Sequence, residues 1–263
     1  MASYDLRRIV TGWDYEPGQI TVRKISGDDG AVKIQMRLDL GILQMETTGR
    51  PDGLRPFDAD SLLDYHTSQL EKHKKVNGTE LGFELSSDEC QSLREEAIQF
   101  YHRYLAEFVL EDFEGVERDT ARNLGVLDIC RKYGSTEADR LALEQYRAYL
   151  IMMNTRAQVH LVLRQGRFKT ALARVEAGLR MIGEILAENS YEDAIEESTE
   201  ATILLSLRQE ILARMPADPI QRLEAELEKA VESERYEDAA VLRQRIDVMR
   251  AKEEGAESRK RRR

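Results

Sequence analysis

Four histidines are the side chains in this 263-residue chain that most readily bind metal ions or transfer protons. His66 and His73 lie seven residues apart, two turns along one face of a predicted helix, whereas metal-binding helices usually place two histidines four residues apart. We therefore interpret this helix face as solvated. His102 and His160 fall in other predicted elements. The sequence predicts no metal site and no bound cofactor.

Nucleophilic and phosphate-binding motifs are the next candidates for chemistry. Cys90 and Cys130 lie in separate helical segments without zinc-ligand spacing, so we expect two buried or unreactive thiols. The glycine-containing loops 27–30 and 49–53 are interpreted as turns, because neither is followed by the Gly-Lys-Ser or Gly-Lys-Thr of a phosphate loop. No serine, cysteine or lysine lies in a recognisable nucleophile motif. We expect that the chain is not an enzyme.

Basic side chains concentrate between residues 140 and 181, where eight Lys or Arg stand against two Glu in a chain of net charge -10. A helical pair of local charge +6 can contact phosphates. The candidate nucleic-acid contacts are Arg164, Arg167, Lys169 and Arg174. In the alternative interpretation, neighbouring helices neutralise each other, since residues 184–200 hold seven acidic residues and no Lys or Arg. The basic end of segment 251–263 is expected to form a charged, disordered tail.

The elements that must position these residues begin with a small antiparallel β unit in residues 1–60. Apolar and polar residues alternate from Val32 to Asp39, and a loop with two glycines joins this strand to an earlier one near Ile20. The apolar run 42–45 adds a third strand or extends the second.

Residues 61–214 are predicted to form a scaffold of helical hairpins. Ser86 and Glu89 form a capping box, and Gly134 ends a later helix. Thr136 is predicted to start one long helix toward Gly166. Further helices are expected from Phe168 through Ile185 and from about Tyr191 to Arg214.

An aromatic residue stands just before a new helix at three turns of this scaffold, around residues 113, 168 and 191. Gly166, Phe168 and Ala171 give the segment 141–182 a tetratricopeptide-like pattern. The turns do not keep the repeat length of about 34 residues that such an array requires. A tetratricopeptide-like array and an irregular helical bundle both remain open.

Residues 218–250 are predicted to form a separate helical hairpin. Asp218 is placed as the N-cap, with Pro219 in the first helical turn. Apolar residues at helical spacing form a stripe on each helix, which predicts a coiled-coil seam. The stripes are Ile220, Leu223, Leu227, Ala230 and Val231 on the first helix, and Ala239, Leu242, Ile246 and Met249 on the second.

This segment resembles the UVR motif, which is found in the excision-nuclease subunits UvrB and UvrC and in some Clp ATPase systems. The dipeptides Tyr236-Glu237, Ala239-Ala240 and Leu242-Arg243 occur in the order and spacing of that motif. One departure is Gln244, where the family often has Asp. The resemblance covers only the C-terminal hairpin.

The family uses this hairpin to dock on proteins, so the resemblance implies a protein partner or self-association. A lone pair of short helices also buries too few apolar side chains to offset its chain entropy. The partner-binding residues implied are Ile220, Leu223, Leu227, Ala230, Tyr236, Ala239, Ala240, Leu242, Arg243 and Ile246. In the alternative interpretation the hairpin packs against the preceding helices of its own chain.

The sequence as a whole predicts an α+β fold that is predominantly α, with an N-terminal β unit, a helical scaffold and a C-terminal UVR-like hairpin. The expected function is that of a non-enzymatic adaptor in nucleotide excision repair or Clp-type proteolysis. A cytoplasmic location is expected, because no apolar run has the length of a membrane helix. The alternative function is a DNA-repair accessory that binds nucleic acid through its basic helices and tail.

Overall fold

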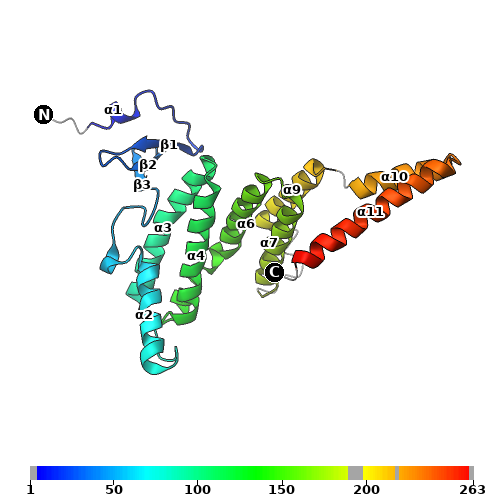
Figure 1. The fold of residues 1–263 in the computed structure, drawn as a ribbon. Helices are drawn as coiled ribbons and strands as arrows, with labels where there is room; N and C mark the ends of the chain where they lie inside the picture. The colour runs from blue at the N-terminus through cyan, green and yellow to red at the C-terminus, as the bar shows by residue number, and fades with distance from the viewer. Residues whose placement is uncertain (1–4, 189–197, 217–218, 261–263) are drawn as a thin grey trace. The chain divides into compact units, whose positions relative to one another are not determined.

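The computed structural model describes residues 5–188, 198–216 and 219–260 (Figure 1), and it leaves the side chains of residues 188, 219–222 and 250–260 undescribed. The chain divides into two compact units, Met1–Ile211 and Leu212–Arg263. The first unit is called the helical unit below, and the second contains the C-terminal hairpin. None of the helices in the described ranges is long and apolar enough to cross a membrane. The predicted α+β class, predominantly α, is confirmed.

A three-stranded antiparallel sheet lies at the N-terminal end of the helical unit (Figure 1). Its strands are β1 (Thr21–Ser26), β2 (Val32–Arg37) and β3 (Ile42–Glu46), in that order. The register pairs Ile34 with Met45. Both side chains are buried and pack with Ala106 on a neighbouring helix, so the apolar face of the predicted strands is the face that joins the sheet to the scaffold.

The helical unit continues as a series of helices in which each long helix packs on the next. The helix α3 lies against α4, α4 against α6, and α6 against α7. Leu204 of α9 approaches Gly178 of α7 closely. The bounds are α1 (Arg7–Val10), α2 (Leu62–Asn77), α3 (Ser87–Val109), α4 (Phe113–Tyr133), α5 (Glu137–Leu141), α6 (Arg147–Leu163), α7 (Phe168–Glu188) and α9 (Thr199–Arg214), with short 3-10 turns η1 (Pro56–Asp58) and η2 (Glu144–Tyr146).

The predicted start of α3 is confirmed in atomic detail. The Ser86 side chain accepts a hydrogen bond from the backbone N–H of Glu89, and the Glu89 carboxylate accepts one from the backbone N–H of Ser86. This reciprocal pair satisfies two N–H groups that have no partner inside the helix. The predicted end of α4 at Tyr133, before Gly134, is also confirmed.

The prediction of one continuous helix from Thr136 toward Gly166 was wrong. Thr136 does cap a helix, but α5 ends at Leu141 and a 3-10 turn precedes α6. Tertiary contacts explain the interruption: Leu143 packs against both large apolar clusters of the helical unit, and the Arg147 guanidinium donates to Glu144 (2.8 Å) and to Asp128 of α4 (2.7 Å). These contacts depend on α4, which a helical periodicity within one segment does not encode.

The interpretation of the His66 and His73 face as solvated was wrong for His66. Its side chain is buried, and burial lowers the pKa of the imidazole below its ordinary value. His73 Nε2 lies 3.0 Å from the carbonyl oxygen of Leu81. Across the described residues, no cluster of three or more His, Cys, Asp or Glu side chains is arranged to hold a metal ion.

Cys90 and Cys130 are free, buried thiols, as expected. They come from α3 and α4 and meet in one apolar cluster, where burial raises the pKa of both thiols. Two predicted features, the helix start near Tyr191 and the N-cap at Asp218, lie outside the described residues.

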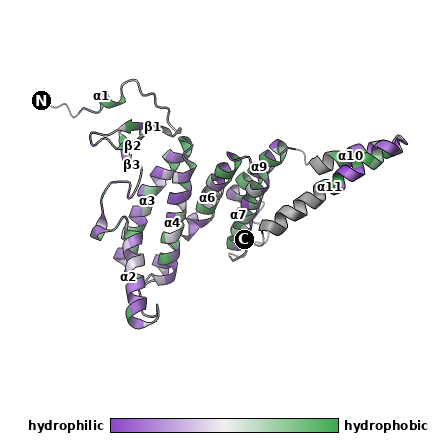
Figure 2. Ribbon diagram, viewed as in Figure 1, coloured by the Kyte–Doolittle hydropathy of each residue, from purple (hydrophilic) through white to green (hydrophobic). Residues whose placement is uncertain are grey.

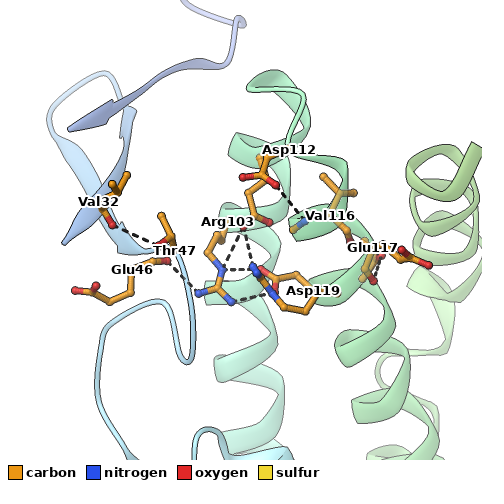
Figure 3. A network of polar contacts seen from close by, with 12 residues as sticks. Val32, Glu46, Thr47, Arg103, Asp112, Val116, Glu117 and Asp119 are labelled. Carbon is orange, nitrogen blue, oxygen red and sulfur yellow. Dashed lines mark hydrogen bonds and ion pairs between the residues drawn. The ribbon is translucent and has the colours of Figure 1, made fainter. Parts of the chain in front are cut away.

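Charged side chains are buried where the sheet meets α3 and α4 (Figure 3). Arg103 donates to both carboxylate oxygens of Asp119, at 2.6 and 2.9 Å, and to the backbone carbonyl of Glu46 at 3.0 Å. Arg118 donates to Glu107 at 2.8 Å, and a Cβ at Gly115 would lie 2.4 Å from that Glu107 carboxyl. A Cβ at this position would therefore force the Glu107 carboxyl to shift from where it lies between the two helices.

A second buried carboxylate, Glu96, accepts from the backbone N–H of Leu62 at 2.8 Å and pairs with Arg122 of α4 and Arg50 of the loop after β3. The helices that carry these ions are also less apolar than the helices that follow: Figure 2 shows more apolar residues on α6 and α7 than on α2, α3 and α4. The ion pairs fix the sheet, α2 and the loop between them to the scaffold.

Candidate docking surface on the C-terminal hairpin

The C-terminal hairpin consists of α10 (Pro219–Glu232) and α11 (Tyr236–Lys260) joined by a three-residue turn (Figure 1). The helix α11 extends over much of the segment 251–263, whose side chains lie outside the description. The helix α10 is strongly amphipathic, whereas the apolar residues of α11 are distributed around its circumference. An evenly distributed pattern predicts that α11 presents apolar side chains on more than one face.

The turn is a Schellman motif with an unusual residue at its left-handed position. The backbone N–H of Arg235 donates to the carbonyl of Ala230 (2.8 Å), and that of Glu234 donates to Val231 (3.0 Å). Glu234 has φ 56°, in the region that glycine adopts without strain. The turn is therefore held together at a local cost that the packing of the two helices must offset.

Three apolar side chains are buried where the two helices meet: Ala230, Ala239 and Ile246. The two alanines permit close approach of the helix backbones. Leu223, Leu227, Leu242 and Met249 are half-buried along the same seam. The structure thus brings most of the predicted partner-binding residues together inside the hairpin, where their first contacts are with each other.

The remaining predicted partner-binding residues have different positions. Tyr236, Ala240 and Arg243 are exposed, and the Ile220 side chain lies outside the described residues. Tyr236 is 67% exposed, at the first position of α11. These exposed groups are available to a partner without any opening of the seam.

Three further exposed apolar side chains, Val231, Val241 and Val248, were not among the predicted site residues. Their exposed fractions are 49%, 53% and 50%. Val241 and Val248 are seven residues apart and therefore share one face of α11. That spacing is visible in the sequence. The prediction used the longer stripe through Ala239, Leu242 and Ile246, because each helix of the hairpin was expected to have one apolar face.

A groove of about 350 Å³ runs beside this face. Ala230, Val241 and Leu242 supply its apolar lining. Its charged lining residues are the cations Lys229, Arg235 and Arg245 and the acids Glu226 and Asp238. An apolar floor with charges of both signs on the rim is the arrangement of a protein-binding surface.

The predicted nucleic-acid contacts lie elsewhere, around the turn between α6 and α7. Arg164, Arg167, Lys169 and Arg174 are all exposed. Arg164 donates to the backbone carbonyl of Glu111 at 2.9 Å and to its carboxylate at 3.3 Å, and its guanidinium lies over the Phe113 ring. Arg164 is thus engaged within the chain, and Arg167 donates to Gln165 at 3.3 Å.

Comparison with known protein families finds a match in the C-terminal hairpin. The model of the UvrB/uvrC motif, named UVR, matches residues 218–252, which comprise α10 and the first part of α11. Comparisons with curated proteins and with solved structures found no match for the chain. The sequence-based identification of a UVR motif in the C-terminal hairpin is confirmed, and it extends to this segment of the chain alone.

Proposed function

We propose that the chain, whose C-terminal hairpin carries a UVR motif, is a non-enzymatic adaptor that docks a protein partner on this hairpin. The observation that carries the proposal is that the hairpin closes its own seam and still exposes Tyr236, Val241 and Val248. Covering these side chains with a partner removes apolar area from water and stabilises both the hairpin and the complex.

The partner that fits this surface is another helical element with an apolar stripe and charges on both sides of it. Arg235 and Arg245 favour acidic side chains on the partner, whereas Glu226 and Asp238 favour basic ones. Paired helices that carry both signs of charge meet this requirement. A subunit of nucleotide excision repair and a component of Clp-type proteolysis are the two classes of partner that the motif suggests.

The test compares the intact full-length chain with two single variants of α11. Val241→Glu places a charge in the groove, and Gln244→Glu places the same charge at an exposed position that does not line the groove. Each chain is used to capture partners from the source organism's lysate, and the captured proteins are identified by mass spectrometry. Circular dichroism first establishes that both variants keep the helix content of the intact chain.

The proposal predicts that one partner is captured by the intact chain and by Gln244→Glu and is lost with Val241→Glu. The identity of the captured protein would also show whether the chain acts in excision repair or in a Clp system. Equal capture by all three chains would remove the hairpin face as the docking surface. Light scattering of the purified chains distinguishes a second copy of the chain from a different protein.

A further inference from the structure

A cleft of about 760 Å³ opens in the helical unit between α3, α4 and the interrupted segment that precedes α6. Its lining is mostly apolar and aromatic. The volume lies within the range of about 300–1,000 Å³ that is typical of small-molecule sites. The cleft belongs entirely to the helical unit, so it is independent of the C-terminal hairpin and of the docking proposed there.

The interruption between α5 and α6 forms one wall of this cleft. Leu143 and Tyr146 line it from the segment where the predicted continuous helix is broken. A 3-10 turn within a helical segment is frequently found at functional positions. The departure from regular helix therefore coincides with this cleft.

Three tyrosines, Tyr101, Tyr104 and Tyr149, converge in the cleft from α3 and α6. The rings of Tyr101 and Tyr104 make an edge-to-face contact with centroids 5.5 Å apart. Burial raises the pKa of Tyr104 and of Tyr149, and the neighbouring phenols raise it further. The phenols of Tyr104 and Tyr149 therefore stay neutral, and each retains an O–H group that can donate a hydrogen bond.

Two basic side chains, His102 and Arg94, line the cleft beside the tyrosines. Burial lowers the pKa of His102, so its imidazole is neutral at physiological pH. The Arg94 guanidinium donates to Asp139 at 3.2 Å and to Gln91 at 2.8 Å. The Glu95 carboxylate also lines the cleft and accepts from Gln91 at 2.8 Å, so an anionic ligand would lose its hydration without gaining an opposite charge, which is unfavourable.

We propose that this cleft binds a neutral, planar heteroaromatic small molecule, of the size class of a free nucleobase or an indole. The rings of Tyr101 and Tyr149, which are not fully buried, provide faces for stacking, and their phenols and the His102 imidazole provide hydrogen-bond donors and acceptors for ring heteroatoms. Tyr104 is 1% exposed and packs against Tyr101. Ile98, which is 56% exposed at the cleft, provides an apolar contact at its edge.

The test measures binding of adenine and of indole to the full-length chain by ligand-observed saturation-transfer NMR, followed by titration. Adenosine monophosphate serves as the charged counterpart and cyclohexanol as the non-planar neutral one. Two variants of α3 are compared: Ile98→Arg places a charge at the cleft, and Val109→Arg places it at an exposed apolar position outside the cleft lining. Both side chains are exposed, so both variants are expected to fold.

The proposal predicts that at least one of the two planar probes binds. Ile98→Arg should raise the dissociation constant of that probe by at least about tenfold, whereas Val109→Arg should leave it unchanged. Adenosine monophosphate and cyclohexanol should bind at least about tenfold more weakly than that probe. Absence of binding by both planar probes at millimolar concentration would overturn the proposal. Equal binding by Ile98→Arg would do the same. If neither planar probe binds and the Ile98→Arg variant no longer captures a protein that the intact chain captures, the cleft is a protein-binding site and the proposal is overturned.

Discussion

The helical unit and the C-terminal hairpin are both built from antiparallel helices, but they differ in what they bury. The helical unit contains large apolar clusters and fully buried ion pairs such as Arg103 with Asp119. Among its described side chains the hairpin buries three apolar ones, and it keeps the Arg235–Asp238 pair at its surface. The comparison indicates that internal contacts account for the stability of the first region, whereas the second leaves apolar groups exposed, and we propose that a partner covers them.

The largest effect is expected from breaking an ion pair in each region. Asp119→Asn removes the carboxylate to which the buried Arg103 donates at 2.6 and 2.9 Å, while the exposed Arg118 keeps its pair with Glu107, so the substitution should lower the free energy of unfolding of the helical unit by about 3–5 kcal/mol. Asp238→Asn removes a surface pair and should change the stability of the hairpin by no more than about 1 kcal/mol.

Urea unfolding followed by the fluorescence of Trp13, the single tryptophan, reports on the helical unit. Trp13 lies against Arg23 of β1, at 3.9 Å from the guanidinium to the ring centroid. Similar effects of the two substitutions on their own regions would contradict the contrast between them.

A smaller effect is expected from the buried acid Glu107. Burial, and then the nearby Asp119, raise the pKa of Glu107 from 4.5 to about 8. A raised pKa in the folded state means that the stability this group contributes is present below pH 4.5 and is lost as the pH rises to about 8. Between these two pH values, the free energy of unfolding of the Glu107→Gln variant should therefore fall less than that of the original chain.

The measurement is the difference in urea stability between the two chains at a series of pH values, because the contributions of His66 and other shared groups cancel in that difference. The same substitution at Glu228, an exposed position of α10, should leave the pH dependence unchanged. A constant difference across the range would show that Glu107 titrates at its ordinary pKa.

The smallest effect, and the one of opposite sign, is expected in the hairpin turn. Glu234→Gly relieves the left-handed backbone at φ 56° and should stabilise the hairpin by about 0.5–1 kcal/mol. Glu232→Gly, two residues earlier at the end of α10, should destabilise it by about 0.5–1 kcal/mol, since glycine is a poor helix former. Hydrogen exchange of the α10 and α11 amides distinguishes the two outcomes. If the amides exchange more slowly than in the original chain in both variants, or in neither variant, the turn is not strained.

Local patterns in the sequence predicted most of the fold. The alternation around Ile34 predicted β2, and the capping box at Ser86 predicted the start of α3, because both signals act between residues that are close in the chain. The UVR motif was likewise identified from dipeptides within one segment. The boundary at residue 60 between the β unit and the helical scaffold stays a prediction, as does the tetratricopeptide-like interpretation of the scaffold.

Only the tertiary structure decided which predicted features would be buried or interrupted. His66 was expected in solvent and lies inside, and the helix expected from Thr136 is interrupted where Leu143 and Arg147 contact other helices. Val241 and Val248 became candidate docking residues once Ala239 and Ile246 were found in the seam. The physical reason is that hydrogen bonds and periodicity within a segment are encoded locally, whereas burial depends on which distant segment covers each face.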